Sequence, residues 1–253
     1  MTCRLAAVVL TRNESKHIVG CLQSLAWADQ RVVLDSGSHD DTVTLARRCG
    51  AQVLIHPFKD FASQRNAALL AVESDWVFFV DADERATPEL ADEVRQAVAR
   101  SEDSRVGWWV PRHNFMLGHR MRGGGWYPDP QLRLLRRGKA HYDPQRPVHE
   151  IVILDGSAGT LQNVLVHYNY DSIAQFRDKM LRYTEHECQI LYDRGVRTRP
   201  WTQVTMPVRE FWRRFVGLRG YKDHLYGLLF CGLMAWYTHV TYRRLRQKRA
   251  GAG

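Results

Sequence analysis

Two carboxylates follow an apolar run in the amino-terminal half of the chain. Residues 76–80 read WVFFV, Asp81 follows directly, and Asp83 stands two positions later. Such a short run, rich in aromatic and β-branched residues, predicts a strand that is covered on both faces. Carboxylates leaving the end of a strand can turn toward one hard cation, so the segment predicts a divalent metal site. The structural alternative is that Asp81 caps a turn, while Asp83 and Glu84 precede a helix that Pro88 starts.

The elements before this run predict the sheet that positions it. Apolar segments at residues 5–10, 32–34 and 52–55 alternate with segments of helical periodicity, the first of which carries Ile18 and Leu22 on one face. Strand and helix alternating at this spacing predict right-handed crossovers and a mostly parallel α/β sheet flanked by helices. The polar residues that follow each strand should then lie at one edge.

Hydrogen-bonding side chains suited to a base and a ribose follow the first two strands: Thr11, Asn13, Asp35 and Ser36. Arg65 and Asn66, on the predicted helix before the acidic strand, can reach the same edge. The chain contains neither a G-x-G-x-x-G segment nor a Walker loop, which are the usual backbone cradles for phosphate. A metal ion at the acidic pair would take over that task.

Four linked segments resemble a known family. VVLTRNES, VVLDSGSHDDT, ASQRNAAL and VDADE, in this order and spacing, are similar to the nucleotide-sugar-binding half of the family 2 inverting glycosyltransferases, which have the GT-A fold. The likeness is strong over residues 4–100. It implies a Mg²⁺ or Mn²⁺ site with Asp83 as the main ligand and Asp81 beside it. It also implies a UDP-sugar site in which Thr11, Arg12, Asn13 and Glu14 line the uridine pocket and Asp35 and Ser36 contact the base or ribose. The expected nucleotide-sugar site further includes Arg65, Asn66, Asp81 and Ala82.

The second half is expected to supply the acceptor site. Residues 106–114 predict a strand, and the glycines 123–125 after it permit a loop that folds closely against a ligand. Trp126 and Tyr127 can stack on a sugar face. Candidates for contacts with the diphosphate or an anionic acceptor are Arg133, Arg136 and Arg137. The alternative is a solvated basic hairpin whose aromatic residues belong to a core.

Inverting transfer needs a general base near the acceptor hydroxyl, opposite the departing nucleotide. Asp129, which follows the glycine run and the aromatic pair, is our first candidate, and it resembles the family's acidic position in the acceptor segment. Glu150 is the second candidate. His149 or His167 can add a metal ligand, although a lone histidine is more often structural.

The net charge of +9 is concentrated near the carboxyl end, where ten basic and two acidic residues follow Pro200. Five scattered cysteines without a C-x-x-C pair predict neither a disulfide framework nor a zinc site, and reduced thiols suit a cytoplasmic setting. The first apolar segment is too short for a signal peptide. We therefore do not expect export by that route.

The basic carboxyl-terminal segment suggests contact with a membrane. Residues 225–241 contain no charged residue and approach the length that spans a bilayer, while Trp212 and Phe215 beside arginines suit a helix lying among headgroups. We expect residues 1–198 to form the GT-A domain, with a donor half at 1–100 and an acceptor half at 101–170. A helix at 172–194 should pack on it, and residues 199–253 should lie peripherally or monotopically on the anionic cytoplasmic face. The alternatives for the segment are a spanning helix, a core hairpin or a dimer interface.

The stretch from NFMLGHRMRGGGWYPD to PVHE resembles bacterial lipopolysaccharide core glucosyltransferases, which use lipid-linked saccharide acceptors at the cytoplasmic membrane. The resemblance implies transfer from a nucleotide-sugar, UDP-linked in our expectation, to a saccharide or lipid-linked acceptor of the cell envelope. A polyprenyl-phosphate glycosyltransferase is the alternative within the fold. The sequence pI of about 9.5 raises a non-catalytic membrane- or nucleic-acid-binding protein as another, but no nucleic-acid-binding motif is present.

Overall fold

The computed structural model describes residues 3–100, 104–143 and 151–251. The chain forms two compact units: Met1–Arg112 with Pro130–His167, and His113–Asp129 with Tyr168–Gly253. This division differs from the expected boundary at residue 198. The difference arises because Phe176, on the helix predicted to pack on the GT-A domain, packs instead against Phe230 of the carboxyl-terminal segment, with ring centroids 5.2 Å apart.

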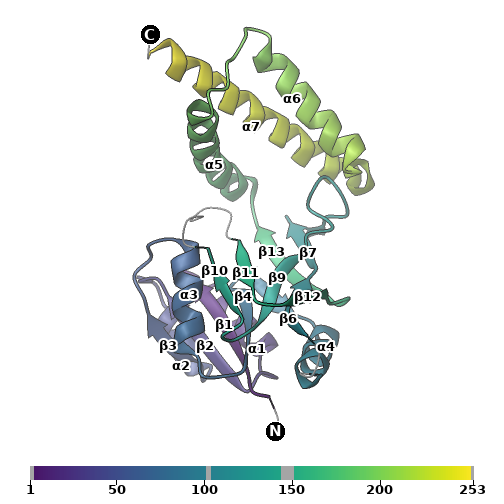
Figure 1. Ribbon diagram of the computed structural model, residues 1–253. Helices are drawn as coiled ribbons and strands as arrows, with labels where there is room; N and C mark the ends of the chain where they lie inside the picture. Colours follow the sequence, from purple (N-terminus) through teal and green to yellow (C-terminus); the bar gives the residue numbers. More distant parts are fainter. Residues whose placement is uncertain (1–2, 101–103, 144–150, 252–253) are drawn as a thin grey trace. The chain divides into compact units, whose positions relative to one another are not determined.

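A seven-stranded sheet with the order β12-β6-β9-β4-β1-β2-β3 forms the centre of the first unit (Figure 1). Strands β4, β1, β2 and β3 are parallel, and β9 enters antiparallel between β4 and β6. The mostly parallel α/β sheet is therefore confirmed. The strand bounds are β1 Leu5–Thr11, β2 Gln30–Asp35, β3 Gln52–Ile55, β4 Trp76–Asp81, β6 Arg105–Val110, β9 Gln131–Arg136 and β12 Ser157–Thr160.

Helices cover both faces of this sheet. Strand β4 illustrates how both faces are buried. Its residues alternate between two core clusters: Phe78 packs on the face with α1, α2 and α4, and Phe79 on the face with α3. Burial of each such side chain contributes about 1.5–3 kcal/mol relative to exposure. The helix bounds are α1 Ile18–Ser24, α2 Thr42–Arg48, α3 Phe61–Ala71 and α4 Pro88–Ala99. Pro88 begins α4 as predicted, after Thr87 caps it.

The single strand expected at residues 106–114 is two strands, β6 and β7, interrupted at Pro111, which lacks the N–H that a continuous ladder needs. Short strands complete the described sheets. β5 pairs with β13, β7 with β8, and β10 with β11. Their bounds are β5 Glu84–Ala86, β7 Arg112–Met116, β8 His119–Arg120, β10 Ala140–Tyr142, β11 Val152–Leu154 and β13 Leu165–Tyr170.

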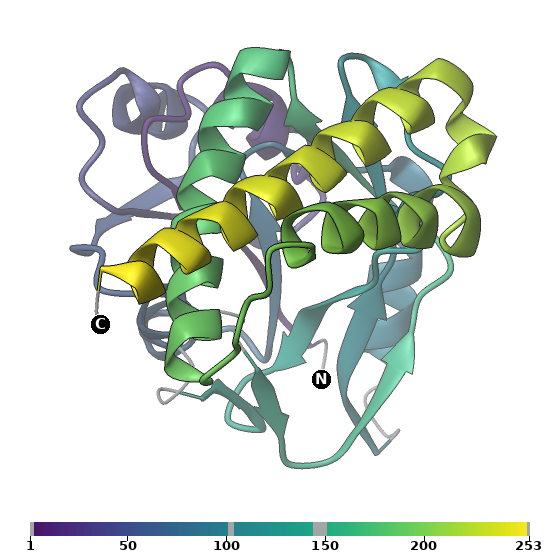
Figure 2. The same ribbon diagram turned by 90° about the horizontal axis from the view of Figure 1, so that it is seen from above.

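The second unit is mainly helical. Its helices are α5 Ile173–Asp193, α6 Thr202–Trp212 and α7 His224–Ala250, with a π-helical turn at Arg213–Gly217 and a 3₁₀ turn at Gly220–Asp223 between the last two. α6 and α7 lie side by side in both Figure 1 and Figure 2. Its core contains Met116, Met121, Tyr170, Phe176, Phe230 and Tyr237. Among the described helices, none is both long enough and apolar enough to cross a membrane.

The glycine run lies against the turns before α7, within the second unit. A Cβ atom on Gly123 would stand 2.2 Å from the carbonyl oxygen of Arg219, and the Gly124 N–H donates to the carbonyl oxygen of Leu218 at 2.7 Å. We expected these glycines to allow close approach to a ligand. The close approach is instead to the chain's own backbone, so the glycines are needed to assemble this unit.

Candidate functional site

The carboxyl ends of β1, β2 and β4 meet at one edge of the main sheet. β1 lies between β4 and β2. Thr11 stands opposite Asp35 in one pairing, and Leu10 stands opposite Asp81 in the other. The chain leaves β1 toward β2, while β4 lies on the other side, so this edge holds a topological switch point, where open α/β sheets bind ligands.

Asp35 is completely buried and organises the loop after β2. Its carboxylate accepts hydrogen bonds from Thr11 Oγ1 at 3.1 Å and from the N–H groups of Gly37 and Ser38 at 2.9 and 2.8 Å. We expected Asp35 to contact a base or ribose. The Ser38 hydroxyl also donates to this carboxylate, at 2.5 Å. A carboxylate with no exposed surface and four such donors holds the loop instead, so Asp35 is a positioning residue in this structure.

The loop after β1 is joined to the loop after β2. Asn13 has a φ of 57°, its N–H donates to Ser38 Oγ at 2.8 Å, and its Oδ1 accepts from the His39 N–H at 2.9 Å. These bonds fix the shape of the rim and offset the cost of the left-handed backbone. The predicted donor-site residues of these two loops that keep exposed or half-buried surface are Arg12, Asn13, Glu14 and Ser36.

Two arginines hold Asp81 at the end of β4. Arg133 Nη2 lies 2.5 Å from Asp81 Oδ2, and Arg65 Nη2 lies 3.4 Å from Oδ1. Burial acts to raise the pKa of Asp81, but the charges of Arg133 and Arg65 outweigh it and hold this pKa well below its ordinary value. Arg133, expected to contact a diphosphate, is 3% exposed and is instead committed to carboxylates of its own unit.

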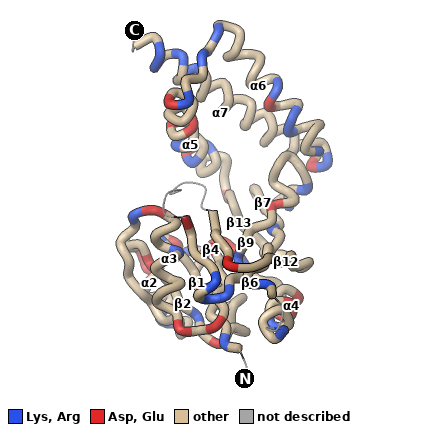
Figure 3. The backbone as a smooth tube through the Cα atoms, in the orientation of Figure 1, with Lys and Arg blue, Asp and Glu red and all other residues tan. Residues whose placement is uncertain are grey.

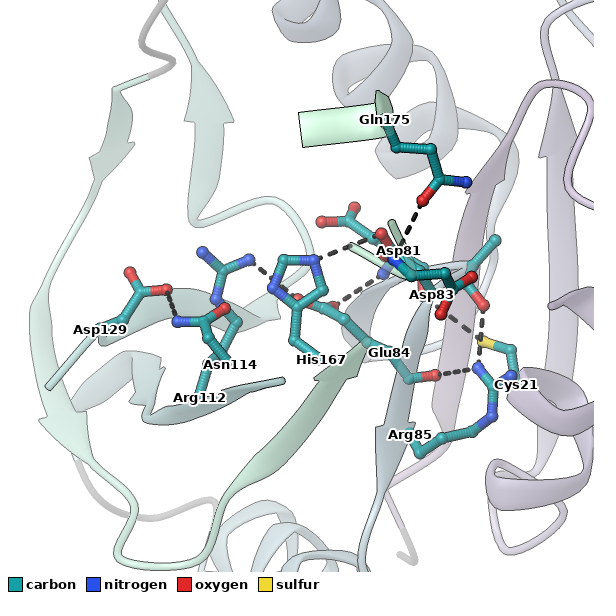
Figure 4. A network of polar contacts seen from close by, with 12 residues as sticks. Cys21, Asp81, Asp83, Glu84, Arg85, Arg112, Asn114, Asp129, His167 and Gln175 are labelled. Atoms are coloured by element: carbon teal, nitrogen blue, oxygen red, sulfur yellow. Dashed lines mark hydrogen bonds and ion pairs between the residues drawn. The ribbon is translucent and has the colours of Figure 1, made fainter. Parts of the chain in front are cut away.

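Glu84 and Arg112 complete this network and were absent from our sequence-based site. Glu84 is fully buried, and its Oε1 accepts from Arg133 Nη2 at 2.8 Å and from Arg112 Nη1 at 3.0 Å. Its Oε2 accepts from the Asp81 N–H at 2.8 Å (Figure 4). In the sequence, only its position directly after Asp83 pointed to Glu84. Nothing in the sequence pointed to Arg112, because it is distant from Glu84 along the chain and meets it only in the folded structure.

Asp83 lies beside His167. His167 stands opposite Glu84 in the β5–β13 ladder, and its Nε2 is 3.3 Å from Asp83 Oδ2 (Figure 4). Both side chains retain some surface, 26% for Asp83 and 9% for His167. Within the described residues there is no group of three or more His, Cys, Asp or Glu side chains that could hold a metal ion. A carboxylate and an imidazole nonetheless form a donor pair that suits Mn²⁺, with a ligand or water filling the other positions.

Three residues expected in the site have other positions. Ala82 is 3% exposed and packs in the core. The Asn66 side chain is bonded to the backbone of Tyr142: its Nδ2 donates to the Tyr142 carbonyl oxygen at 2.9 Å, and its Oδ1 accepts from the Tyr142 N–H at 2.8 Å. Arg136 stands opposite Trp76, the first residue of β4, and is therefore at the far end of that strand from Asp81. Neighbouring Arg137 Nε donates to the Ser74 carbonyl oxygen at 3.0 Å, near the same end.

The second unit holds the remaining candidates. Asp129 Oδ2 accepts from Asn114 Nδ2 at 2.9 Å, and the same amide nitrogen donates to the Trp126 carbonyl oxygen at 2.7 Å (Figure 4). The Trp126 ring packs against Phe230, whereas Tyr127 is 40% exposed. Trp126 is thus largely a packing residue. His149 and Glu150 lie outside the described residues.

Comparison with known proteins agrees with this architecture. Residues 6–165 match the model of the family described as glycosyl transferase family 2. The chain is 27% identical over 257 residues to the lipopolysaccharide core biosynthesis glycosyltransferase LpsC of Rhizobium meliloti (strain 1021), covering 97% of this chain and 93% of LpsC. It is 33% identical over 257 residues to an uncharacterized glycosyltransferase of Rickettsia bellii (strain RML369-C), covering 98% of this chain and 87% of that one.

Among solved structures, the chain resembles glucosyl-3-phosphoglycerate synthase from Mycobacterium tuberculosis in complex with Mn²⁺, uridine-diphosphate and glucosyl-3-phosphoglycerate. The TM-score is 0.50, with 19% identity over 78% of this chain and 81% of that one. At this identity the likeness bears on the fold, which is GT-A. Since the family model covers most of the first unit and the relatives span nearly the whole chain, the chain belongs to glycosyltransferase family 2 and is a glycosyltransferase.

Proposed function

We propose that this enzyme transfers a sugar from a nucleotide-sugar to a saccharide or lipid-linked acceptor of the cell envelope, with inversion at the anomeric carbon. The donor that we propose is a UDP-sugar. Family membership supplies the reaction class. The similarity to LpsC over nearly the full length of both chains supports the envelope assignment.

The donor nucleotide is assigned to the switch-point edge. The buried Thr11–Asp35 pair holds the two loops that shape the rim, and Arg12, Asn13 and Ser36 present exposed or half-buried polar groups there. Because these loops are joined by hydrogen bonds before any ligand arrives, little ordering is required on binding. Glu14 is tied to the same rim, since its N–H donates to Thr42 Oγ1 at 2.7 Å.

Asp83 and His167 are the residues that would hold a divalent cation, Mg²⁺ or Mn²⁺. Such a cation offsets the negative charge that develops on the departing diphosphate. Arg133 and Arg65 neutralise Asp81, and the buried Glu84 fixes the Asp81 backbone. The turn carrying Asp83 is thereby held in place.

Asp129 is assigned as the general base. The acceptor hydroxyl gives its proton to the Asp129 carboxylate while its oxygen forms a bond to the anomeric carbon. The bond from that carbon to the diphosphate oxygen breaks, and its electron pair leaves with the nucleoside diphosphate. Asn114 orients the carboxylate through its 2.9 Å hydrogen bond. Glu150 stays the alternative base.

The observation that carries the proposal is the Asp83–His167 pair beside the arginine-held Asp81 at the end of β4. Calorimetric titration of UDP, GDP and ADP and their sugars, with Mn²⁺ and then with EDTA, tests it. We expect one nucleotide series to bind with Mn²⁺ and to lose at least tenfold in affinity with EDTA or in Asp83→Asn. Asp92→Asn, an exposed carboxylate on α4, is the matched control. Unchanged metal-dependent affinity in Asp83→Asn would remove the assignment.

Peripheral attachment to an anionic membrane is part of the proposal. Exposed apolar side chains recur on one face of α6 at helical spacing: Trp201, Val204, Val208 and Trp212. Figure 3 shows Lys and Arg along α6 and near the carboxyl end of α7. An apolar stripe flanked by cations suits a helix lying in a lipid interface, where each Lys or Arg contributes about 1 kcal/mol near an anionic leaflet.

A further inference from the structure

A basic pocket lies within the second unit, with a volume of about 600 Å³. Three cationic side chains, Arg120, Arg122 and Lys222, line it, and Met121 is the fully buried apolar residue among its walls. Ligand pockets are typically about 300–1,000 Å³, so this volume can hold one or two sugar rings. We call it the basic pocket.

The cations of the basic pocket are available to a ligand. Arg120, Arg122 and Lys222 are exposed, and none of their side chains forms an ion pair or hydrogen bond with another described residue. No acidic residue lines the pocket. The nearby Asp223 carboxylate is fully buried, and it accepts from His119 Nε2 at 3.1 Å and from the Arg122 and Gly123 N–H groups at 2.8 and 2.9 Å. The pocket therefore has an uncompensated positive charge.

Asp223 also fixes the shape of the basic pocket. Its hydrogen bonds join the loop after β8 to the 3₁₀ turn before α7, so both walls are fixed to one buried carboxylate. Lining residue His224 has φ 50° and ψ −124°, a left-handed conformation that is strained for a residue other than glycine. Strain of this kind persists only where the surrounding structure enforces it.

Aromatic and imidazole groups give the pocket features suited to a sugar. Tyr127 and Tyr221 line the pocket and are 40% and 49% exposed, so each has aromatic surface that a sugar ring can contact. The His113 ring is 5.5 Å from the Tyr127 ring. Burial, and then the charge of Arg120, lowers the pKa of His113, so its imidazole is neutral at pH 7 and can hydrogen-bond to a hydroxyl.

The chain connects this pocket to the proposed base. Asn114, which holds Asp129, directly follows His113, and Tyr127 stands two residues before Asp129. We propose that the basic pocket binds the acceptor by an anionic substituent, a phosphate or a carboxylate on the sugar, while the tyrosines contact the sugar ring. This inference rests on the proposed function, because it identifies the pocket as the acceptor site of that reaction.

Binding of simple probes to the full chain tests the proposal without any donor. We expect a hexose 6-phosphate to bind at least tenfold more tightly than the neutral hexose. Arg122→Gln with Lys222→Gln should weaken hexose 6-phosphate binding at least tenfold, and Arg243→Gln, which removes an exposed cation on α7, should not. Equal affinity for the two hexoses, or equal loss in the control variant, would overturn the proposal.

Two further binding measurements distinguish a sugar phosphate from the other anions that the pocket could bind. If inorganic phosphate binds as tightly as the hexose 6-phosphate, the pocket recognises a free anion and not a sugar. If phosphatidylglycerol vesicles displace the hexose 6-phosphate and the double variant loses vesicle binding, the pocket serves a lipid headgroup. Either result would overturn the acceptor assignment. Titration of UDP with Mn²⁺ in the same variants reports on the donor site separately, so failure of one proposal is distinguishable from failure of the other.

Discussion

Charged side chains are arranged differently in the two units of this enzyme. In the first unit, Asp81, Glu84 and Arg133 are paired with one another, and Glu84 and Arg133 are almost fully buried. In the second unit, Arg122 and Lys222 line a pocket, are exposed, and make no side-chain ion pair within the described residues. Arg133 was a candidate for an anion contact from the sequence, whereas Arg122 and Lys222 were not. The structure reverses these tasks, because Arg133 is buried against carboxylates and the other two cations line a pocket.

The difference separates charges that hold geometry from charges that can meet a ligand. A buried ion pair gains little net stability, because desolvation offsets the attraction, yet removal of one partner leaves an uncompensated charge at high cost. An exposed cation without a partner has no such role in stability. Substitutions within the Asp81, Glu84 and Arg133 network should therefore affect folding, and those at Arg122 and Lys222 should affect only binding.

The largest expected effect concerns Asp129, and it tests whether the second unit contributes chemistry as well as binding. Asp129→Asn keeps the shape of the side chain but removes the proton acceptor, so turnover should fall about 10²- to 10⁴-fold. Affinity for the donor nucleotide should not change. Incorporation of labelled sugar from the nucleotide-sugar into membrane extracts measures turnover, and calorimetry measures affinity.

Asp178→Asn, at an exposed carboxylate on α5, is the control for Asp129 and should retain full turnover. Wild-type turnover in Asp129→Asn would contradict the assignment of the base. It would favour Glu150, or a phosphate acceptor that needs no strong base, as in polyprenyl-phosphate glycosyltransferases.

The same substitution at two arginines compares the units directly. Arg133→Met leaves Asp81 and Glu84 without their shared partner and should lower the free energy of unfolding by about 3 kcal/mol, the lower end of the usual range since Asp81 is a third exposed. Arg122→Met should change it by less than about 0.5 kcal/mol. Urea denaturation at pH 7 measures both. Equal changes at the two positions would contradict the division of tasks.

The pH dependence of this pair has a defined sign. The folded-state pKa of Asp81 is lowered, so its stabilising contribution is fully present above the unfolded-state pKa of about 3.9. It is lost as the pH falls from that value through the lower folded-state pKa. The deficit of Arg133→Met relative to wild type should therefore be largest at neutral pH and shrink in acid. Urea denaturation repeated at pH 4 and below checks this, and a deficit that grows in acid would exclude the mechanism.

The parallel sheet could be predicted because its signals are local. WVFFV is buried on both faces, so an uninterrupted apolar run was visible in the sequence, and the helix that starts at Pro88 has its cap and proline in adjacent positions. The family resemblance, carried by four such local segments, was also confirmed by comparison with known proteins. The expected edge of the sheet followed from the strand directions.

The partners of the site residues could not be predicted, because they depend on long-range pairing. Arg133 reaches Asp81 only since β9 enters beside β4, and His167 reaches Asp83 only since β13 pairs with β5. A buried polar side chain also looks the same in sequence whether it faces a ligand or its own backbone. Asn66, bonded to Tyr142, illustrates this ambiguity.

A smaller effect should follow from the glycine run, which forms one side of the contact that assembles the second unit. Gly123→Ala places a methyl group 2.2 Å from the Arg219 carbonyl oxygen, so the backbone must shift, at a cost of about 1–3 kcal/mol in the free energy of unfolding. Gly217→Ala, whose added methyl group would meet no atom within 4 Å, is the matched control. Urea denaturation that finds both variants equally stable would show that the contact at Gly123 is not close.

The smallest effect compares exposed tryptophans of the two units in membrane binding. Trp212, on the apolar face of α6, is 56% exposed, and Trp109, on β6 of the first unit, is 40% exposed. Loss of one partly buried aromatic contact with lipid is worth about 1 kcal/mol, so Trp212→Ser should weaken binding to phosphatidylglycerol vesicles about fivefold while Trp109→Ser leaves it unchanged. Vesicle sedimentation of the full chain measures this.

Point variants are preferable to truncation after Pro200, because removing α7 would expose the buried faces of Phe176 and its neighbours. Equal weakening by the two substitutions would mean that the α6 stripe is not the lipid-facing surface, and the cations of the second unit would then have to be tested alone.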